Sequence, residues 1–134
     1  MKKCLLLLLL LNAINSYSQE CTVSKSYVLN NKFTWELQND PHAILKRVLF
    51  FSENENGIGF VFANNGVRFY NFNDWTVDGY IYSLENANGI SYRLEFDENT
   101  KNVKYVYISL DLLIDDDDLG EVKRYTQFRF EFFE

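Results

Sequence analysis

Short runs of alternating apolar and polar residues, separated by turn-forming residues, recur along most of this chain. In "ISYRLEF" every second residue from Ile90 to Phe96 is apolar, and residues 127–132 repeat the pattern with three phenylalanines. A period of two residues places the apolar set on one face of a strand, so that one face is buried and the other is wet. Asn-Gly pairs in "NENG", "NNG" and "NANG" supply the positive φ angles of tight hairpins. The spacing therefore predicts an antiparallel meander.

Counting these runs predicts an all-β domain of about eight strands, a number that can close into a small barrel. The predicted strands are 22–29, 33–38, 46–53, 58–63, 67–72, 77–84, 90–96, 103–113 and a last run that begins near Val122. A β-sandwich is the alternative, because alternation does not reveal which strands pair. At most one short helix is predicted, near residues 40–47, where Asp40 can cap and Pro41 can open it. A bent strand is the alternative there.

The first 18 residues have the layout of a secretory signal peptide. Two lysines precede an apolar run over residues 4–11, and small polar residues follow up to Ser18. The run is shorter than the ~20 apolar residues of a membrane span. We therefore predict cleavage near Ser18, a single β-barrel domain over residues 19–134, and a secreted or periplasmic location. A lipid anchor at Cys21 is the disfavoured alternative, because Gln19 and Glu20 stand where small residues are expected.

Charge and cysteine content exclude several classes of partner and site. The chain carries a formal net charge of −6, which disfavours nucleic acid because phosphate backbones are repelled. After cleavage, Cys21 is the one remaining cysteine, since Cys4 leaves with the signal. In the cleaved chain this excludes an intramolecular disulfide and a zinc site built on several thiolates.

The order of features resembles the small secreted lipocalin-like proteins. A signal peptide is followed by "TWEL" near the mature start and then by a meander of aromatic-rich strands. The resemblance implies an up-and-down barrel in which Trp35, on the first barrel strand, closes one end. It also implies binding of a small apolar ligand or of a protein.

Catalytic motifs are scarce in this chain. The one histidine, His42, stands beside Pro41 and is interpreted as a surface or cap residue, because no activated-nucleophile motif accompanies it. No "GxSxG" elbow, phosphate loop or metal-spaced histidine pair occurs. Paired carboxylates meet only in the fold, so the 19 acidic residues leave a glycosidase as a minority alternative. We predict a non-enzymatic protein without a cofactor.

Aromatic residues provide the main hypothesis for binding. A buried tyrosine needs a partner for its hydroxyl, so tyrosines on neighbouring strands indicate either a cavity lining or a partner-binding face. Simple filling of the core is the alternative. The predicted ligand-binding residues are Trp35, Phe69, Tyr80, Tyr82, Tyr92, Tyr105 and Tyr107. The first functional hypothesis is a carrier that holds a small apolar or amphipathic ligand in an aromatic-lined cavity.

The acidic stretch "DLLIDDDDLGE" supports a second hypothesis. Asp115 and Asp117 align with the first and third positions of the calcium-loop pattern, but Leu119 and Thr126 do not match its fifth and last ligands. A solvated hairpin loop over residues 115–118 is therefore favoured over a cation site formed with Glu121. The alternative function is an acidic interaction module, such as an envelope inhibitor or an immunity-type protein, that binds a basic partner.

Overall fold

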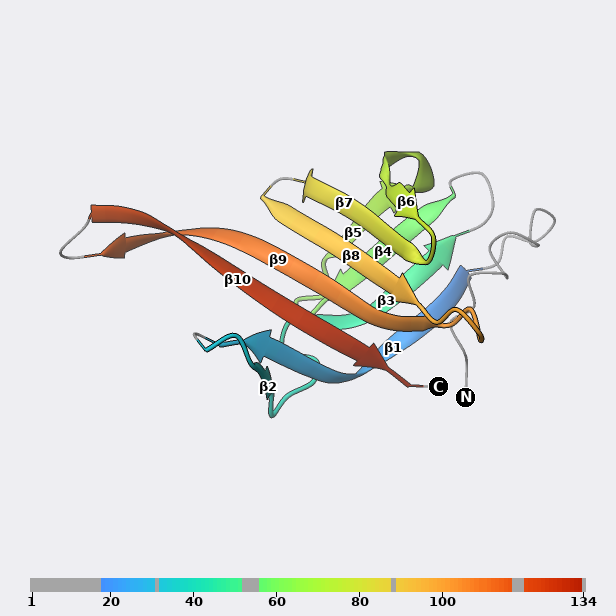
Figure 1. Ribbon diagram of the computed structural model, residues 1–134, viewed down its shortest axis with the longest axis horizontal. Helices are drawn as coiled ribbons and strands as arrows, with labels where there is room; N and C mark the ends of the chain where they lie inside the picture. The colour runs from blue at the N-terminus through green and yellow to red at the C-terminus, as the bar shows by residue number, and fades with distance from the viewer. Residues whose placement is uncertain (1–17, 31, 52–55, 88, 117–119, 134) are drawn as a thin grey trace.

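The computed structural model is all-β, as the alternation predicts (Figure 1). It describes residues 18–30, 32–51, 56–87, 89–116 and 120–133, and only the backbone of residues 18, 86, 111–116 and 120–125. The elements are β1 (Ser18–Leu29), β2 (Trp35–Leu37), β3 (Leu45–Phe51), β4 (Gly57–Phe62), β5 (Val67–Asn71), the 3-10 turn η1 (Phe72–Asp74), β6 (Thr76–Asp78), β7 (Ile81–Ala87), β8 (Ile90–Phe96), β9 (Val103–Asp116) and β10 (Gly120–Phe132). No helix in these ranges is long and apolar enough to cross a membrane.

All the strands belong to one antiparallel sheet. Its order is β5-β4-β3-β1-β10-β9-β8-β7-β6, and β2 pairs with β1 beside this path. The chain is therefore a meander in which the first long strand, β1, also meets the last one, β10. The sheet curls into a half-barrel (Figure 1), which confirms the barrel-like prediction over the sandwich of two sheets.

Strand β1 bends the sheet because its two halves pair with different strands. Residues 18–22 pair with β3, whereas the part from Val23 onward pairs with β10 and carries a bulge between Val23 and Lys25, and its last residues also pair with β2. A bulge adds bend and twist to the strand that carries it. On the opposite side η1 leads from β5 to β6, and no ladder among the described residues joins these two strands. A hydrogen bond between the Tyr70 and Tyr92 hydroxyls, 3.2 Å long, crosses this open seam.

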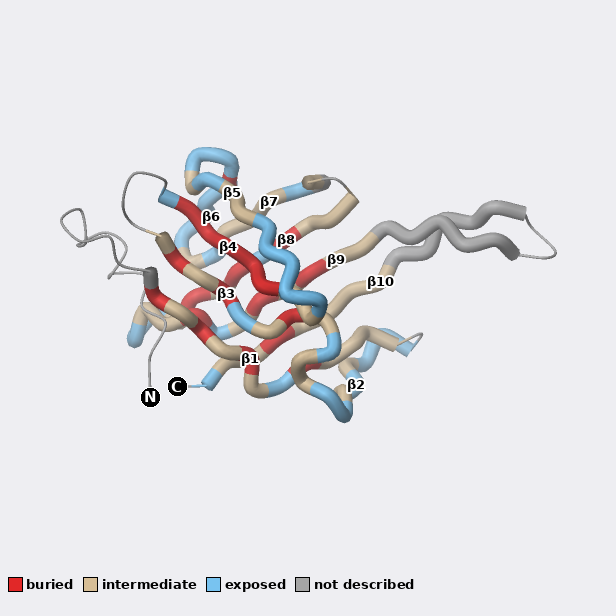
Figure 2. The backbone as a smooth tube through the Cα atoms, turned by 180° about the vertical axis from the view of Figure 1, so that it is seen from behind, coloured by how far each residue is buried: buried red, intermediate tan, exposed pale blue. Residues whose placement is uncertain are grey.

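The core fills the concave face of the curl. One transverse row of cross-strand neighbours on this face consists of Ser26, Phe130, Val106, Leu94 and Tyr82. Deeper in the seam, the rings of Phe60 and Tyr92 stack with their centroids 4.4 Å apart. The buried segments run along β1, β3, β4, β8 and β9 (Figure 2). Phe130, Val106 and Leu94 of this row are fully buried, and each side chain of this kind contributes about 1.5–3 kcal/mol to stability.

No helix forms near residues 40–47, where at most one short helix was predicted with a bent strand as the alternative. Asp40 Oδ1 accepts the backbone N–H of His42 at 2.9 Å, and the Ala43 N–H donates to the Asp40 carbonyl at 3.3 Å. This cap closes a turn rather than a helix, because β3 begins at Leu45 and buries Leu45 and Val48 on the core face. Burial on the pleated sheet outweighs a weak local helix signal.

The strand predicted over residues 77–84 is two strands. Gly79 adopts φ +60° between β6 and β7, and the chain reverses there so that Val77 lies opposite Tyr82. Glycine takes this left-handed conformation without the steric penalty of a Cβ. The pair Asp78-Gly79 at this turn is itself a hairpin signal, which the alternation of apolar and polar residues does not take into account.

The last hairpin is longer than its sequence predicts. β9 runs to Asp116 and β10 starts at Gly120, with Glu121 opposite Asp115, so Asp115 and Asp116 lie in a strand and not in a loop. The predicted ends were near Leu113 and Val122. Beyond Leu110 the described part of β9 pairs with β10 alone, and this two-stranded part extends from the body of the sheet (Figure 1).

The predicted signal peptide lies almost entirely outside the described residues, so its cleavage stays a prediction. Cys21 is 1% exposed on β1, opposite Val48. Cys21 is disulfide-bonded in this chain, which retains residues 1–18, so the expectation of a lone thiol after cleavage stays a prediction. The other cysteine of the sequence, Cys4, lies outside the described residues.

Candidate functional site

The turn between β4 and β5 forms one lip of a cavity, and its "NNG" residues each have a separate role. Asn64 Oδ1 accepts the backbone N–H of Gly66 at 2.9 Å. Asn65 takes φ +65°, a left-handed conformation that asparagine tolerates better than most residues. A Cβ on Gly66 would lie 2.9 Å from Asn64 Oδ1, so glycine leaves room for this contact. The predicted hairpin turn is confirmed, and it fixes the start of β5.

The segment before β3 forms the neighbouring lip. His42 Nε2 lies 2.7 Å from the Val23 carbonyl oxygen. A carbonyl oxygen only accepts, so His42 must donate from Nε2 and anchors this segment to β1. The Ala63 N–H donates to the Ile44 carbonyl at 2.9 Å and ties the two lips together. His42 thus has a structural role here, although it caps no helix, since none forms in this segment.

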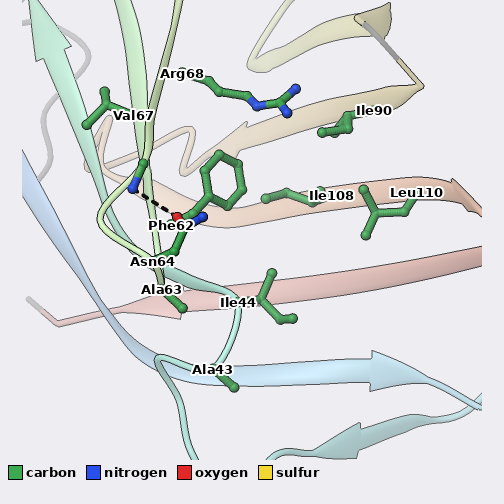
Figure 3. Close-up of a pocket in the computed structure, with 11 residues that line it drawn as sticks. Ala43, Ile44, Phe62, Ala63, Asn64, Val67, Arg68, Ile90, Ile108 and Leu110 are labelled. Carbon is green, nitrogen blue, oxygen red and sulfur yellow. Dashed lines mark hydrogen bonds between the residues drawn. The ribbon is translucent and has the colours of Figure 1, made fainter.

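Between these lips and the opposite strands lies a cavity of about 570 Å³. Its apolar wall consists of Ile44, Phe62, Val67, Ile90, Ile108 and Leu110. Figure 3 shows Ile90, Ile108 and Leu110 on β8 and β9, facing the side chains of the β4–β5 turn. A cavity of this size lies within the range of about 300–1,000 Å³ that holds small organic ligands.

Arg68 is the only charged residue among the eleven that line the cavity. In cross-strand register it lies opposite Phe60, and Phe60 lies opposite Val48, so Arg68 shares the concave face with two fully buried side chains. Its side chain extends from β5 along the cavity toward Ile90 (Figure 3). None of the ion pairs found between described residues involves Arg68.

Two of the predicted binding residues lie away from the cavity, Tyr92 in the core and Tyr82 packed against it. Tyr92 is 2% exposed, stacks on Phe60 and bonds to Tyr70. Burial, and then the hydrogen bond to Tyr70, raise the pKa of Tyr92, whereas the positive charge of Arg68 opposes this rise. Tyr82 packs edge-on against Phe96 at 5.2 Å, and burial raises its pKa as well. Neither tyrosine lines the cavity.

Three further predicted residues gather on the opposite, outer face of the sheet. Trp35 lies 5.8 Å from Tyr107, which in turn lies 6.0 Å from Tyr105, measured between ring centroids. We call these three rings, together with Tyr27 and Arg129, the outer cluster. Trp35 therefore does not close an end of the barrel from inside, because it stands on β2, beside the main path of the sheet.

Arg129 holds the outer cluster together. Its guanidinium carbon lies 4.5 Å from the Tyr27 ring centroid, 5.0 Å from that of Trp35 and 5.2 Å from that of Tyr105. Tyr27, Arg129, Tyr107 and Arg93 are successive partners in one transverse row. Arg93 covers the Tyr107 ring at 4.3 Å, so cations and rings alternate along the row. Cation–π contacts of this kind stabilise a sheet face.

The remaining predicted residues lie apart from both places. Phe69 packs edge-on against Phe51 at 5.4 Å on the outer face of β3–β5, where a Cβ on Gly57 would approach its ring to 2.5 Å. Tyr80 accepts a hydrogen bond from Lys101 Nζ at 2.5 Å and lies beneath that ammonium group. The seven predicted residues thus form no single site, and their binding role stays a prediction.

The structure does not describe the side chains of the acidic residues that were predicted as weak candidates for a cation site. Asp115 and Glu121 are described only by their paired backbone, and Asp117 lies outside the described residues. Elsewhere in the described part of the chain, no group of three or more His, Cys, Asp or Glu residues has a metal-binding arrangement. A cation site at this hairpin stays a prediction.

Sequence reasoning missed the cavity lining, although one signal was present. Arg68 and Tyr70 alternate with Val67 and Phe69 in the run after "NNG". Since Tyr70 faces the core, the two-residue period places Arg68 on the same face. A lone cation on a concave face was therefore readable once the inward set was known. Comparison of the chain with protein-family models, curated proteins and solved structures gives no significant match.

Proposed function

We propose that this protein is a secreted, non-enzymatic binding protein that holds a small apolar or amphipathic ligand in the cavity at the β4–β5 turn. The observation that carries the proposal is the cavity of about 570 Å³ with its mainly aliphatic wall. Apolar surface that is removed from water on binding contributes about 25 cal/mol per Å² to the free energy of binding, which favours an apolar ligand. The curled sheet supplies a rigid frame around this space.

The position of the cavity agrees with the packing of the interior. Aromatic stacking around Phe60, Tyr70 and Tyr92 fills the centre of the curl. Branched aliphatic side chains line the cavity at Ile90 and Ile108. The ligand of this proposal therefore lies against aliphatic groups, and the tyrosines do not line its site.

A neutral fluorescent probe tests the proposal directly. We expect N-phenylnaphthylamine to bind the purified protein saturably, with a rise in fluorescence as the probe leaves water. Ala63→Trp places an indole in the cavity and should weaken this binding by about 10-fold or more, which corresponds to ~1.4 kcal/mol. Val77→Trp is the matched control, because Val77 is 53% exposed on β6 and does not line the cavity.

Three results would contradict the proposal. The first is the absence of saturable probe binding to the wild-type protein. The second is unchanged affinity in Ala63→Trp when its far-ultraviolet circular dichroism matches that of the wild type. The third is an equal loss of affinity in both tryptophan variants.

A further inference from the structure

We propose that the ligand is an amphiphile with a single anionic head group, a carboxylate or a phosphate ester, and that Arg68 binds this head while the tail occupies the aliphatic wall. This inference rests on the proposed function, since it assigns the class of ligand for the same cavity. Three observations support it: the position of Arg68 on the concave face, the lack of acidic residues among those that line the cavity, and the amide group of Asn64 on the same side.

The surroundings of Arg68 contain no competing carboxylate within the cavity. The lining residues comprise eight apolar side chains, one glycine, Asn64 and Arg68, so no acidic residue is among them. Arg47, in contrast, lies 2.6 Å from Glu20, and Arg93 lies 3.3 Å from Glu95. Within the described residues, the arginines of the outer face have protein partners, whereas Arg68 faces an apolar space.

The chemistry of the guanidinium group selects the head group. Arginine presents several N–H donors in one plane and matches the paired oxygens of a carboxylate or phosphate. Its charge persists at any physiological pH, so it is available to an anion at the rim of the cavity. The charge already acts on the interior, since it opposes the raised pKa of Tyr92.

Asn64 supplies a second donor at the same lip. Its Oδ1 must be the atom that accepts the Gly66 N–H, because an amide nitrogen cannot accept that bond. The amide nitrogen, with its two N–H donors, is therefore the other end of the group. Figure 3 shows Asn64 and Arg68 on the same side of the cavity, on the β4–β5 turn and β5, while Leu110 lies opposite.

Displacement of the neutral probe by ligands with the same tail and different heads tests this inference. We expect dodecanoate or dodecyl phosphate to displace N-phenylnaphthylamine at concentrations about 10-fold below those needed for dodecanol, because a hydrogen bond to a charged group contributes ~1.5–3 kcal/mol. Dodecyltrimethylammonium should compete no better than dodecanol. The stronger of the two anions identifies the head group, and all ligands are used below their micelle concentrations.

Arg68 variants connect the preference to this residue. In Arg68→Gln the advantage of the anions over dodecanol should fall to within about 2-fold while the affinity for dodecanol is retained, and Arg68→Lys should keep part of the advantage. Arg47→Gln removes the same charge from the outer face and should leave the preference intact. Equal displacement by dodecanoate, dodecyl phosphate and dodecanol, or an anion preference that survives in Arg68→Gln, would overturn the inference while probe binding still supports the carrier. Failure of the neutral probe to bind would instead overturn the proposed function.

Discussion

Two arginines on the same sheet have different surroundings. Arg129, on the outer face, lies within 5.2 Å of three aromatic ring centroids and 4.0 Å from Glu131, and its side chain is 20% exposed. Arg68, on the concave face, is exposed at the rim of an aliphatic cavity and forms no ion pair with the described residues. One guanidinium group is enclosed by protein, and the other faces space that a ligand can fill.

This contrast distinguishes an arginine that stabilises the fold from an arginine that is available to bind a ligand. The rings around Arg129 gain from its presence in every folded molecule, so its contacts contribute to the free energy of unfolding. No ion pair or cation–π contact found between described residues involves Arg68, so it gains nothing comparable from the protein. An aromatic cluster is therefore not by itself a binding site. Here the tyrosines and the tryptophan of the outer face contact Arg129 of the same chain.

The largest expected effect comes from truncating Arg129. Arg129→Ala removes three cation–π contacts and the packing of the aliphatic stem, and should lower the free energy of unfolding by about 2–3 kcal/mol. Arg68→Ala should change it by no more than ~0.5 kcal/mol, as exposed substitutions usually do. Urea unfolding followed by circular dichroism measures both.

Arg129→Met provides the internal control for this pair. The methionine keeps an unbranched apolar stem against the rings of Tyr27 and Trp35, so about half of the loss should be recovered. Comparable losses in Arg129→Ala and Arg68→Ala would break the comparison, because the two arginines would then serve stability equally.

A smaller effect, of about 1 kcal/mol at neutral pH, is expected for Tyr92→Phe, which removes the hydrogen bond to Tyr70. Tyr107→Phe, on the outer face, should have less effect because its ring contacts survive.

Burial raises the pKa of Tyr92, so the unfolded chain loses this proton first as the pH rises. The stability due to neutral Tyr92 is therefore fully present below about pH 10 and declines above it.

Thermal unfolding between neutral pH and about pH 11 measures this decline. The wild-type protein should lose ~1 kcal/mol more than Tyr92→Phe over the last pH unit, since one unit corresponds to ~1.4 kcal/mol per coupled group. Tyr107→Phe should follow the wild-type profile. Parallel profiles for the wild type and Tyr92→Phe would show that the buried tyrosine does not govern alkaline unfolding.

Much of the fold was predictable because burial follows strand alternation. The period of two residues in 90–96 places Tyr92 and Leu94 inside, and the structure confirms both. The "NNG" turn was predictable from its local chemistry. Near residues 40–47, where at most one short helix was predicted, no helix forms because Leu45 is buried on β3. The single strand over 77–84 was wrong, because the chain reverses at Gly79.

The candidate site was less predictable for a related reason. Alternation shows that Tyr105 and Tyr107 share a face, but it does not show which face is concave. The pairing of β1 with β10 decides this, and that pairing joins the two ends of the chain. The positions of the aromatic residues in the sequence therefore fitted the outer cluster as well as a cavity lining. The position of Arg68 on the concave face became evident only from the curl of the sheet.

The smallest expected effect tests the lip of the cavity through two glycines. In Gly66→Ala the new Cβ would lie 2.9 Å from Asn64 Oδ1, the end of a side chain that can move, so stability should fall by only ~0.5 kcal/mol. The displaced Asn64 should reduce the preference for dodecanoate over dodecanol by about threefold, or ~0.6 kcal/mol. Gly79→Ala is the matched control: its φ of +60° should cost about 1 kcal/mol of stability, and nothing within 4 Å of the new Cβ connects it to the cavity. Probe displacement should therefore show the larger effect in Gly66→Ala, whereas urea unfolding should show the larger effect in Gly79→Ala.

A greater loss of ligand preference in Gly79→Ala than in Gly66→Ala would mean that the preference follows overall stability. The distinction between the cavity and the rest of the sheet would then fail.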